Sequence, residues 1–204
     1  MKAYLELCRP SQWVKNIFVL IPLIFARKFF DMDMVILSMA ALGIFILASS
    51  SVYVLNDLID YPRDRLHPDK KKRPLASGRV SSGGAAFLWV VLTILALGLA
   101  YKLSLIFFLV VLGYLLLTIS YSFFLKKVIF LDVILIALGF VFRVLAGGVA
   151  VNVFVSGWLI VLVFLFTLFL AISKRRQELR NLETKSQPIY EWFRYPVWRF
   201  RRPC

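Results

Sequence analysis

Long apolar runs alternate with short polar segments along most of the chain. Six runs are long enough to form helical membrane spans, and they cover residues 14–30, 34–55, 85–101, 103–121, 128–151 and 154–172. Each run is apolar all round, which is typical of a helix surrounded by lipid or by other spans. A hydrocarbon core about 30 Å thick needs about 20 helical residues, because lipid offers no partner to a free backbone amide. The pattern predicts an all-α, polytopic transmembrane helix bundle.

Composition excludes an ordinary soluble domain. Of the 204 residues, 61% are hydrophobic and 18% are charged, and the mean hydropathy is +0.82. The net charge of +14 would suggest nucleic acid in a soluble protein. Here the basic residues lie in short segments between apolar runs, which favours membrane topology and phosphate binding and argues against nucleic acid. Cys8 and Cys204 are too far apart to indicate a disulfide or metal framework. No small-residue cleavage site closes the first run, so we expect it to be retained.

Lysine and arginine are distributed unevenly between the two sides of the predicted bundle. With Lys15 counted at the start of the first span, 21 of them lie on one side. The other side carries Arg27, Lys28 and Lys102, and Arg143 lies within a span. Basic residues concentrate in cytoplasmic loops. We therefore expect a multi-pass protein of the inner (plasma) membrane whose termini and longest polar loop face the cytoplasm.

That loop, residues 56–78, begins with three carboxylates. On a helix, Asp57, Asp60 and Asp64 form one stripe about 10 Å long, given a rise of about 1.5 Å per residue. Like charges so arranged repel, which predicts a cation among them. Magnesium suits the pattern, because it binds one or two carboxylates and completes its octahedral shell with water and phosphate oxygens. Pro62 interrupts the helical pattern, so we expect the helix to end before Asp64.

The second half of the loop supplies positive charge. Lys70 and Arg73 bound a run of four basic residues that can bind the phosphate charge left by magnesium. The alternative is a solvated loop of mixed charge whose lysines only set topology. His67 precedes Pro68, which favours extended or turn backbone. It is interpreted either as a substrate contact or as a structural residue.

The pattern N-D-x-x-D-x-x-x-D over residues 56–64 resembles the first aspartate motif of the UbiA prenyltransferase superfamily. Segments 9–16, 67–78, 121–132, 139–147 and 173–178 are similar to the branch of that superfamily that contains decaprenyl-phosphate phosphoribosyltransferases. The resemblance implies an all-helical enzyme of nine spans that binds Mg²⁺ and a diphosphate. In this branch it implies a donor of phosphoribosyl diphosphate and a polyprenyl (decaprenyl) phosphate acceptor, for synthesis of cell-envelope polysaccharide precursors.

The resemblance also implies roles for individual residues. Asp57, Asp60 and Asp64 would coordinate magnesium on the diphosphate, with Asn56 supporting that shell. Three further residues would complete the catalytic group: Lys126 would face the same phosphates, and Asp132, with Tyr121, would replace part of the second aspartate motif of prenyl-transferring relatives. The acceptor phosphate is already anionic, so attack on the anomeric carbon needs no strong general base.

Three basic residues outside the loop are further candidates for substrate binding. Arg143 lies inside a span, where an unpaired charge is costly, so it should face the bundle interior and find a carboxylate or a phosphate. Lys15 is interpreted as a contact of the acceptor phosphate or as an interfacial anchor. Lys174 ends the sixth span and is interpreted as a substrate contact or a topology anchor.

The resemblance runs from about Arg9 to Leu182, and we interpret residues 1–182 as an incomplete UbiA-like transmembrane domain. Residues 183–204 form an atypical basic and aromatic tail, and three of the nine spans are missing, which suggests a frameshifted or truncated product. Two alternatives to phosphoribosyl transfer remain open at this point. One is a prenyltransferase with a polyprenyl diphosphate donor and an aromatic acceptor, and the other is an inactive, truncated membrane protein. A homo-oligomer is possible with either.

Overall fold

The computed structural model describes residues 2–66, 70–123 and 129–184, and this part of the chain is helical throughout. The elements are α1 Lys2–Leu7, η1 Pro10–Leu20, α2 Ile21–Phe25, α3 Met32–Asp64, η2 Lys70–Lys72, α4 Ser82–Leu103, α5 Leu105–Phe123, α6 Ile129–Ala150 and α7 Gly157–Thr184. No strand occurs in these residues. The predicted all-α membrane bundle is confirmed.

Five helices, α3 to α7, are long and apolar enough to cross a membrane. The first expected span differs from the prediction in its bounds. Its apolar helix runs over Pro10–Phe25 and is shorter than the other five. The chain turns after Phe25, and α3 begins at Met32. The described residues therefore contain six apolar helical segments, of which five have full span length by themselves.

The short first segment is extended by its 3₁₀ geometry. A 3₁₀-helix rises about 2.0 Å per residue, so η1 and α2 together reach about 30 Å, close to the hydrocarbon thickness. Side chains three residues apart eclipse each other in this geometry. Trp13, Asn16 and Val19 follow that spacing, and the last two are fully buried. The segment thus presents one straight stripe to the bundle.

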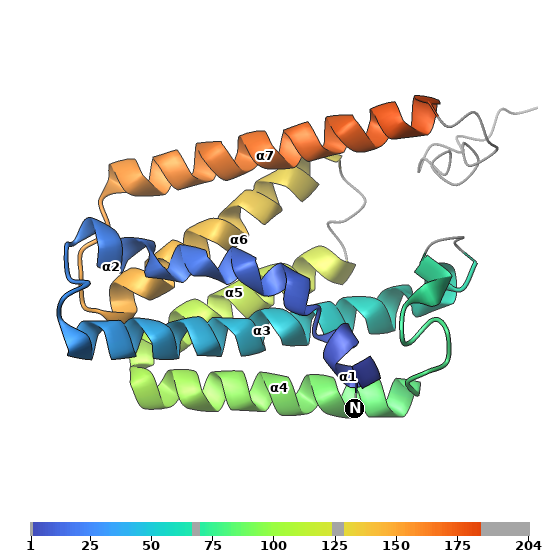
Figure 1. The fold of residues 1–204 in the computed structure, drawn as a ribbon, viewed down its shortest axis with the longest axis horizontal. Helices are drawn as coiled ribbons and strands as arrows, with labels where there is room; N and C mark the ends of the chain where they lie inside the picture. The colour runs from blue at the N-terminus through green and yellow to red at the C-terminus, as the bar shows by residue number, and fades with distance from the viewer. Residues whose placement is uncertain (1, 67–69, 124–128, 185–204) are drawn as a thin grey trace, which may run out of the picture.

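Helices that follow one another in the chain pack side by side in the bundle, from α3 to α7, with η1 against α3 and α6 (Figure 1). The largest buried cluster joins α3, α5 and α6, where the ring of Phe45 lies 6.3 Å from that of Phe107 and 5.2 Å from that of Tyr114. Gly147 on α6 allows the closest approach: a Cβ there would lie 1.9 Å from the carbonyl oxygen of Val19. This packing holds η1 against the bundle.

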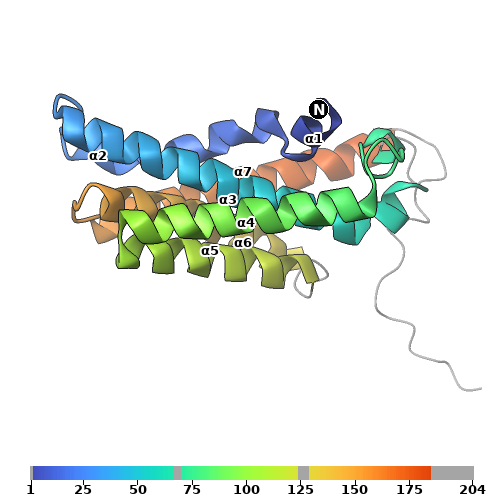
Figure 2. The same ribbon diagram turned by 90° about the horizontal axis from the view of Figure 1, so that it is seen from below.

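One end of the bundle gathers the polar segments. The N-terminal helix α1, the end of α3 with the loop that follows it, and the end of α7 all lie at the same end in Figures 1 and 2. The segments predicted to share one side of the membrane are therefore together. That this side is cytoplasmic stays a prediction.

Helix α3 continues through Pro62 and ends at Asp64. The expectation that the helix would end before Asp64 is wrong. Proline within a helix removes one backbone donor. Here Pro62 is exposed and lies in the last turn, so the missing bond weakens only the end of the helix. The boundary expected after residue 182 falls near the end of α7, and residues 185–204 lie outside the described part of the chain.

Candidate functional site

The last three turns of α3 carry the acidic stripe. Asp57 and Asp64 are 3% and 4% exposed, and Asp60 between them is half-buried. The helical spacing expected from the sequence is therefore present in all three residues. Because burial removes water from two of these carboxylates, they need positive or hydrogen-bonding partners close by.

Two arginines supply those partners. Arg9 donates through Nη2 to Oδ1 of Asp57. Nη1 of Arg73 lies 3.3 Å from the same oxygen and 2.7 Å from Oδ2 of Asp64. The sequence predicted a cation among the carboxylates, and in this structure guanidinium groups occupy that role. Charge-assisted bonds of this kind are the stronger class of hydrogen bond.

The loop after α3 is folded so that Arg73 reaches back to the helix. Leu75 and Val80 are 3% exposed and pack with Leu7 and Val54 in a second hydrophobic cluster. The amide of Val80 donates to the carbonyl of Pro74 at 3.1 Å, closing the turn. Burial of these apolar side chains holds the loop against α1 and α3. It thereby holds Arg73, which directly precedes this packed part of the loop, next to the acidic stripe.

Arg9 approaches from the other side in an unusual backbone conformation. Its φ and ψ are 50° and 66°, in the left-handed region. A non-glycine residue there is uncommon and costs about 1–2 kcal/mol. The conformation turns the chain from α1 into η1 and brings the guanidinium over Tyr53, 5.3 Å from its ring centroid, and onto Asp57.

The residues of this stripe fit a magnesium ion bound together with a phosphorylated ligand. Within the described ranges, no group of three His, Cys, Asp or Glu side chains forms a ready-made metal cluster. Magnesium does not need one, because it takes one or two carboxylates and fills its shell with water and phosphate oxygens. Asn56 Oδ1 is buried and accepts no hydrogen bond from any residue that the structure describes. An unsatisfied acceptor beside the carboxylates suits a metal-bound water.

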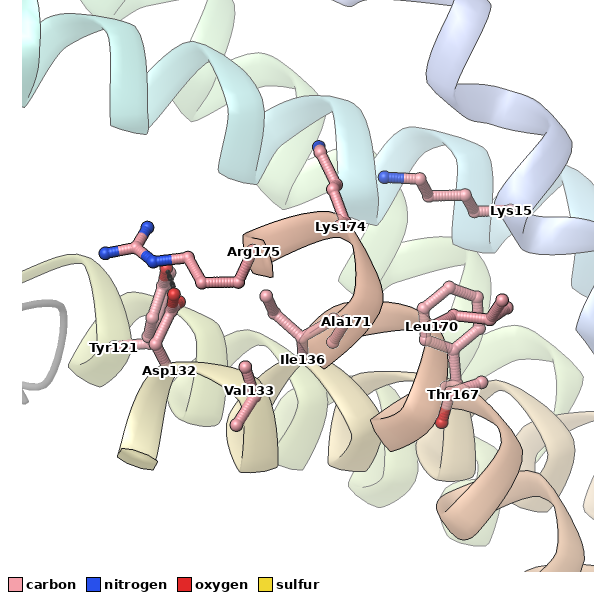
Figure 3. Close-up of a pocket in the computed structure, with 11 residues that line it drawn as sticks. Lys15, Tyr121, Asp132, Val133, Ile136, Thr167, Leu170, Ala171, Lys174 and Arg175 are labelled. Carbon is pink, nitrogen blue, oxygen red and sulfur yellow. Dashed lines mark hydrogen bonds between the residues drawn. The ribbon is translucent and has the colours of Figure 1, made fainter. Parts of the chain in front are cut away.

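A cavity of about 350 Å³ lies beside the stripe, between η1, α5, α6 and α7. We call it the lysine cavity, and its polar lining comes from Lys15, Tyr121, Asp132, Thr167, Lys174 and Arg175. In Figure 3, Lys15 of η1 and Lys174 of α7 extend toward the same part of this cavity. Tyr121 donates a hydrogen bond to Asp132 on its other side, near Arg175.

A second cavity, of about 190 Å³, adjoins the first and shares Lys15 and Tyr121 with it. We call it the arginine cavity, and its polar lining comes from Lys15, Tyr53, Asn56, Tyr114, Thr118, Tyr121 and Arg143. No acidic residue is among the described residues that line it. Lys15 lies near enough to Lys174, Arg143 and Arg9 for their charges to repel its ammonium group. The two cavities therefore form a basic compartment next to an acidic helix end.

Arg143 faces the bundle interior, as predicted, and is 5% exposed. The predicted partner was a carboxylate or a phosphate, and no carboxylate in the described part of the chain contacts it. Instead Nε donates to Oδ1 of Asn16 at 2.9 Å, Nη1 to the carbonyl of Gly139 at 2.7 Å, and Nη2 to the hydroxyl of Tyr114 at 3.1 Å. Neutral acceptors and the flanking rings of Tyr114 and Phe140 hold this charge.

The structure brings most of the predicted site residues together. Asn56, the three aspartates and Arg73 meet at the end of α3, and Lys15, Tyr121, Asp132, Arg143 and Lys174 line the two cavities. Lys70 lies in η2 on the exposed side of the loop. His67 and Lys126 lie outside the described residues.

The roles of four residues at the site were not predicted. Arg9 is the partner of Asp57, and Asn16, Tyr53 and Tyr114 lie around the arginine cavity. Asn16 and Tyr114 each place a polar group inside an apolar run, and such a group is costly in a membrane unless it has a partner. That signal was available in the sequence. The pairing of Arg9 with Asp57 joins residues 48 positions apart and depends on the fold.

The chain is similar in sequence to known proteins. The chain is 34% identical to a decaprenyl-phosphate phosphoribosyltransferase of Mycolicibacterium smegmatis, over 89% of this chain and 58% of that protein. It is 36% identical to a protein of the same name from Mycobacterium tuberculosis, over 89% of this chain and 61% of that one. It spans about three fifths of the length of these relatives.

A solved structure shares the fold. The UbiA homolog from Archaeoglobus fulgidus bound to GPP and Mg²⁺ superposes with a TM-score of 0.65 and 24% identity, over 81% of this chain and 60% of that one. Residues 17–189 match the UbiA prenyltransferase family. This range includes α3 with its acidic stripe and all the later spans. The chain belongs to the UbiA prenyltransferase family.

Proposed function

We propose that this chain carries the substrate site of a magnesium-dependent transferase that moves a 5-phosphoribosyl group from phosphoribosyl diphosphate to a polyprenyl phosphate. The product would be a lipid-linked phosphopentose for cell-envelope polysaccharide synthesis. Support comes from the relatives of that name at 34–36% identity, and from a site that sets an acidic helix end beside a strongly basic compartment.

The donor's diphosphate belongs at the acidic stripe. Asp57, Asp60 and Asp64 would hold magnesium, with Asn56 Oδ1 accepting from its water shell. Bound there, magnesium would neutralise negative charge on the departing diphosphate. Arg9 and Arg73 already lie at the same carboxylates, so their spare N–H groups can donate to the diphosphate oxygens.

The lysine cavity suits the acceptor. Lys15, Lys174 and Arg175 can bind the lipid phosphate, and these cations also keep it ionised. Below them the wall is apolar, with Ile136, Leu170 and others in contact range of a prenyl chain. A charged head above an apolar wall matches the chemistry of a polyprenyl phosphate.

The reaction requires positioning more than proton transfer. An oxygen of the lipid phosphate attacks the anomeric carbon of the ribose, the bond from that carbon to the diphosphate breaks, and diphosphate leaves with the bonding electrons. Positive charge develops on the sugar ring in the transition state. Tyr121 and Asp132, joined by a hydrogen bond, place a carboxylate at the edge of the same cavity, where it can stabilise that charge.

The observation that carries the proposal is the concentration of buried or half-buried cations around the two cavities. Lys15 of η1 is half-buried and Arg143 of α6 is buried, and the charges of Arg143 and Lys174 both repel the ammonium group of Lys15. Anions bound in the two cavities would offset this repulsion. A phosphoribosyl donor and a phosphorylated acceptor bring anions at several points, whereas a prenyl diphosphate with an aromatic acceptor brings them only at the diphosphate.

A transfer assay separates the two reactions. Membranes containing the full chain are incubated with magnesium and either labelled phosphoribosyl diphosphate plus polyprenyl phosphate, or labelled prenyl diphosphate plus an aromatic acceptor such as 4-hydroxybenzoate. The proposal expects labelled lipid only from the first mixture, and expects the Asp60→Asn variant to make none. Product from the second mixture alone would overturn it.

The proposal also places the site at the cytoplasmic face of the inner membrane. The described basic segments support this orientation, because α1, the loop after α3 and the end of α7 lie at the site end of the bundle (Figure 1). Single cysteines test it. A cysteine at exposed Lys71, in a background in which Cys8 and Cys204 are both changed to Ser, should react with an impermeant maleimide only after the membrane is opened, and one at Lys102 before. The reverse pattern would contradict the orientation.

A further inference from the structure

The arginine cavity contains hydrogen-bond donors that the described residues around it leave unused. A guanidinium group has five N–H donors. Arg143 uses three of them on Asn16, Gly139 and Tyr114, which leaves one N–H on each terminal nitrogen within the described structure. Tyr114 accepts from Arg143, and its own hydroxyl proton has no acceptor among the described residues. Both side chains line the cavity and are at least 95% buried.

The charge of the cavity points to an anion. The guanidinium of Arg143 is buried, its protein partners are neutral, and the described lining contains no carboxylate. Lys15 adds a second positive charge at the boundary with the lysine cavity. A buried charge without a counter-charge is costly, so the ligand of this cavity should supply the negative charge.

The size of the cavity fits one phosphate group with part of a sugar. Its 190 Å³ corresponds to about six water molecules at about 30 Å³ each. A phosphate group has five heavy atoms, so it fits beside Arg143 with room for the carbon that carries it. A prenyl chain would instead bury hydrocarbon against the charged guanidinium.

The cavity begins where the acidic stripe ends. Asn56 lines it and directly precedes Asp57 in α3. A donor whose diphosphate lies at the aspartates therefore extends its other end toward Arg143. In phosphoribosyl diphosphate that other end is the 5-phosphate, whereas in a prenyl diphosphate it is hydrocarbon.

Resting on the proposed function, we infer that Arg143 and Tyr114 bind the 5-phosphate of the donor in the arginine cavity, so that Arg143 determines the choice of a phosphoribosyl donor over a prenyl donor. Asn16 is a positioning residue, because its amide also donates to Ser49 at 3.0 Å and so fixes the oxygen that accepts from Arg143.

Two donors that differ only in the 5-phosphate test this inference. The full chain is assayed with phosphoribosyl diphosphate and with ribosyl diphosphate, which lacks that phosphate. The wild type should prefer the first by about 10- to 100-fold in kcat/KM, as expected of hydrogen bonds to a buried charge. Arg143→Gln should reduce this preference to about threefold or less. The matched control is Lys102→Gln, which changes a basic residue in the last turn of α4 and should keep the preference for phosphoribosyl diphosphate. An equal preference in the wild type and in Arg143→Gln overturns the inference.

A binding measurement separates this inference from the transfer reaction. Ribose 5-phosphate should bind the wild type at least tenfold more tightly than Arg143→Gln, measured by calorimetry in detergent. Such a difference without any transfer of label would overturn the proposed function and keep the 5-phosphate site. If label is transferred but ribose 5-phosphate binds the wild type and Arg143→Gln equally well, the 5-phosphate site is overturned and the proposed function is kept. If Arg143→Gln does not fold, Tyr114→Phe decides, because it keeps the ring and the other bonds of Arg143. It should weaken binding about threefold or more, and unchanged binding overturns the inference.

Discussion

Nη1 of Arg73 lies 2.7 Å from Oδ2 of Asp64. The same nitrogen is 3.3 Å from Oδ1 of Asp57, two helical turns earlier, so one guanidinium bridges the two ends of the acidic stripe. A metal ion that binds these carboxylates must share them with Arg73 or displace it. Metal binding and the position of the 65–81 loop are therefore expected to be linked.

Replacing Arg73 tests this link. Without substrate, Arg73→Gln should bind Mn²⁺ about fivefold more tightly than the wild type, because a partly exposed ion pair contributes about 1 kcal/mol. Electron paramagnetic resonance of the bound Mn²⁺ measures the affinity. Arg79→Gln is the matched control, since Arg79 pairs with Glu6 on the surface at 2.8 Å. Unchanged Mn²⁺ affinity in Arg73→Gln would show that the arginine does not compete with the metal.

Asp57 has a structural and a chemical role, and Asp57→Asn should affect both. The variant removes the charge shared by Arg9 and Arg73, so we expect a loss of about 1–3 kcal/mol of stability. Transfer should fall by about 100-fold or more, since the charge also belongs to the metal site. Thermal unfolding and the lipid-labelling assay measure the two effects. Asp33→Asn, exposed in the first turn of the same helix, should change neither appreciably, and equal behaviour of both variants would refute the assignment.

The left-handed backbone at Arg9 allows its side chain and its conformation to be tested separately. Arg9→Gln and Arg9→Gly both lose the ion pair to Asp57, but glycine adopts this conformation without steric cost. Arg9→Gly should therefore be more stable than Arg9→Gln by about 1 kcal/mol. Both variants should have equally low transfer activity. If Arg9→Gln were the more stable of the two, the left-handed backbone conformation of Arg9 between α1 and η1 would be contradicted.

Gly147 should be indispensable for the position of η1. Alanine there would place its Cβ 1.9 Å from the carbonyl oxygen of Val19, so η1 and α6 would have to separate. We expect a loss of about 1–3 kcal/mol in thermal unfolding, together with reduced transfer, because Lys15 and Asn16 move with η1. Gly98→Ala in α4 meets nothing within 4 Å and should be neutral or slightly stabilising. Similar stability of both variants would contradict the close contact.

The sequence predicted the later spans and the acidic stripe well, because both depend on local pattern. Apolar runs of span length define α4 to α7 to within a few residues, except that α7 extends beyond the predicted span. The spacing of Asp57, Asp60 and Asp64 places them on one face wherever a helix forms. Pro62 misled the prediction because its effect depends on position, and near a helix end a missing donor costs little.

The first span and the arginine pairs could not be predicted in this way. Whether residues 10–20 adopt 3₁₀ or α geometry depends on contacts with α6, including the space left by Gly147. The partner of Arg143 was expected to be charged, because a buried cation usually has one. Within the described protein the acceptors are the neutral side chains of Asn16 and Tyr114, and only the three-dimensional packing brings them to Arg143, while a phosphate partner stays a prediction.

A dual-label experiment follows both products of the proposed transfer at once. Phosphoribosyl diphosphate carrying ¹⁴C in the ribose and ³²P in the terminal phosphate is incubated with the full chain, polyprenyl phosphate and magnesium. The account predicts ¹⁴C in the lipid fraction and an equal molar amount of ³²P in released diphosphate, both abolished in Asp60→Asn. Lipid that contains no ¹⁴C, or ³²P that stays with the lipid, would contradict phosphoribosyl transfer.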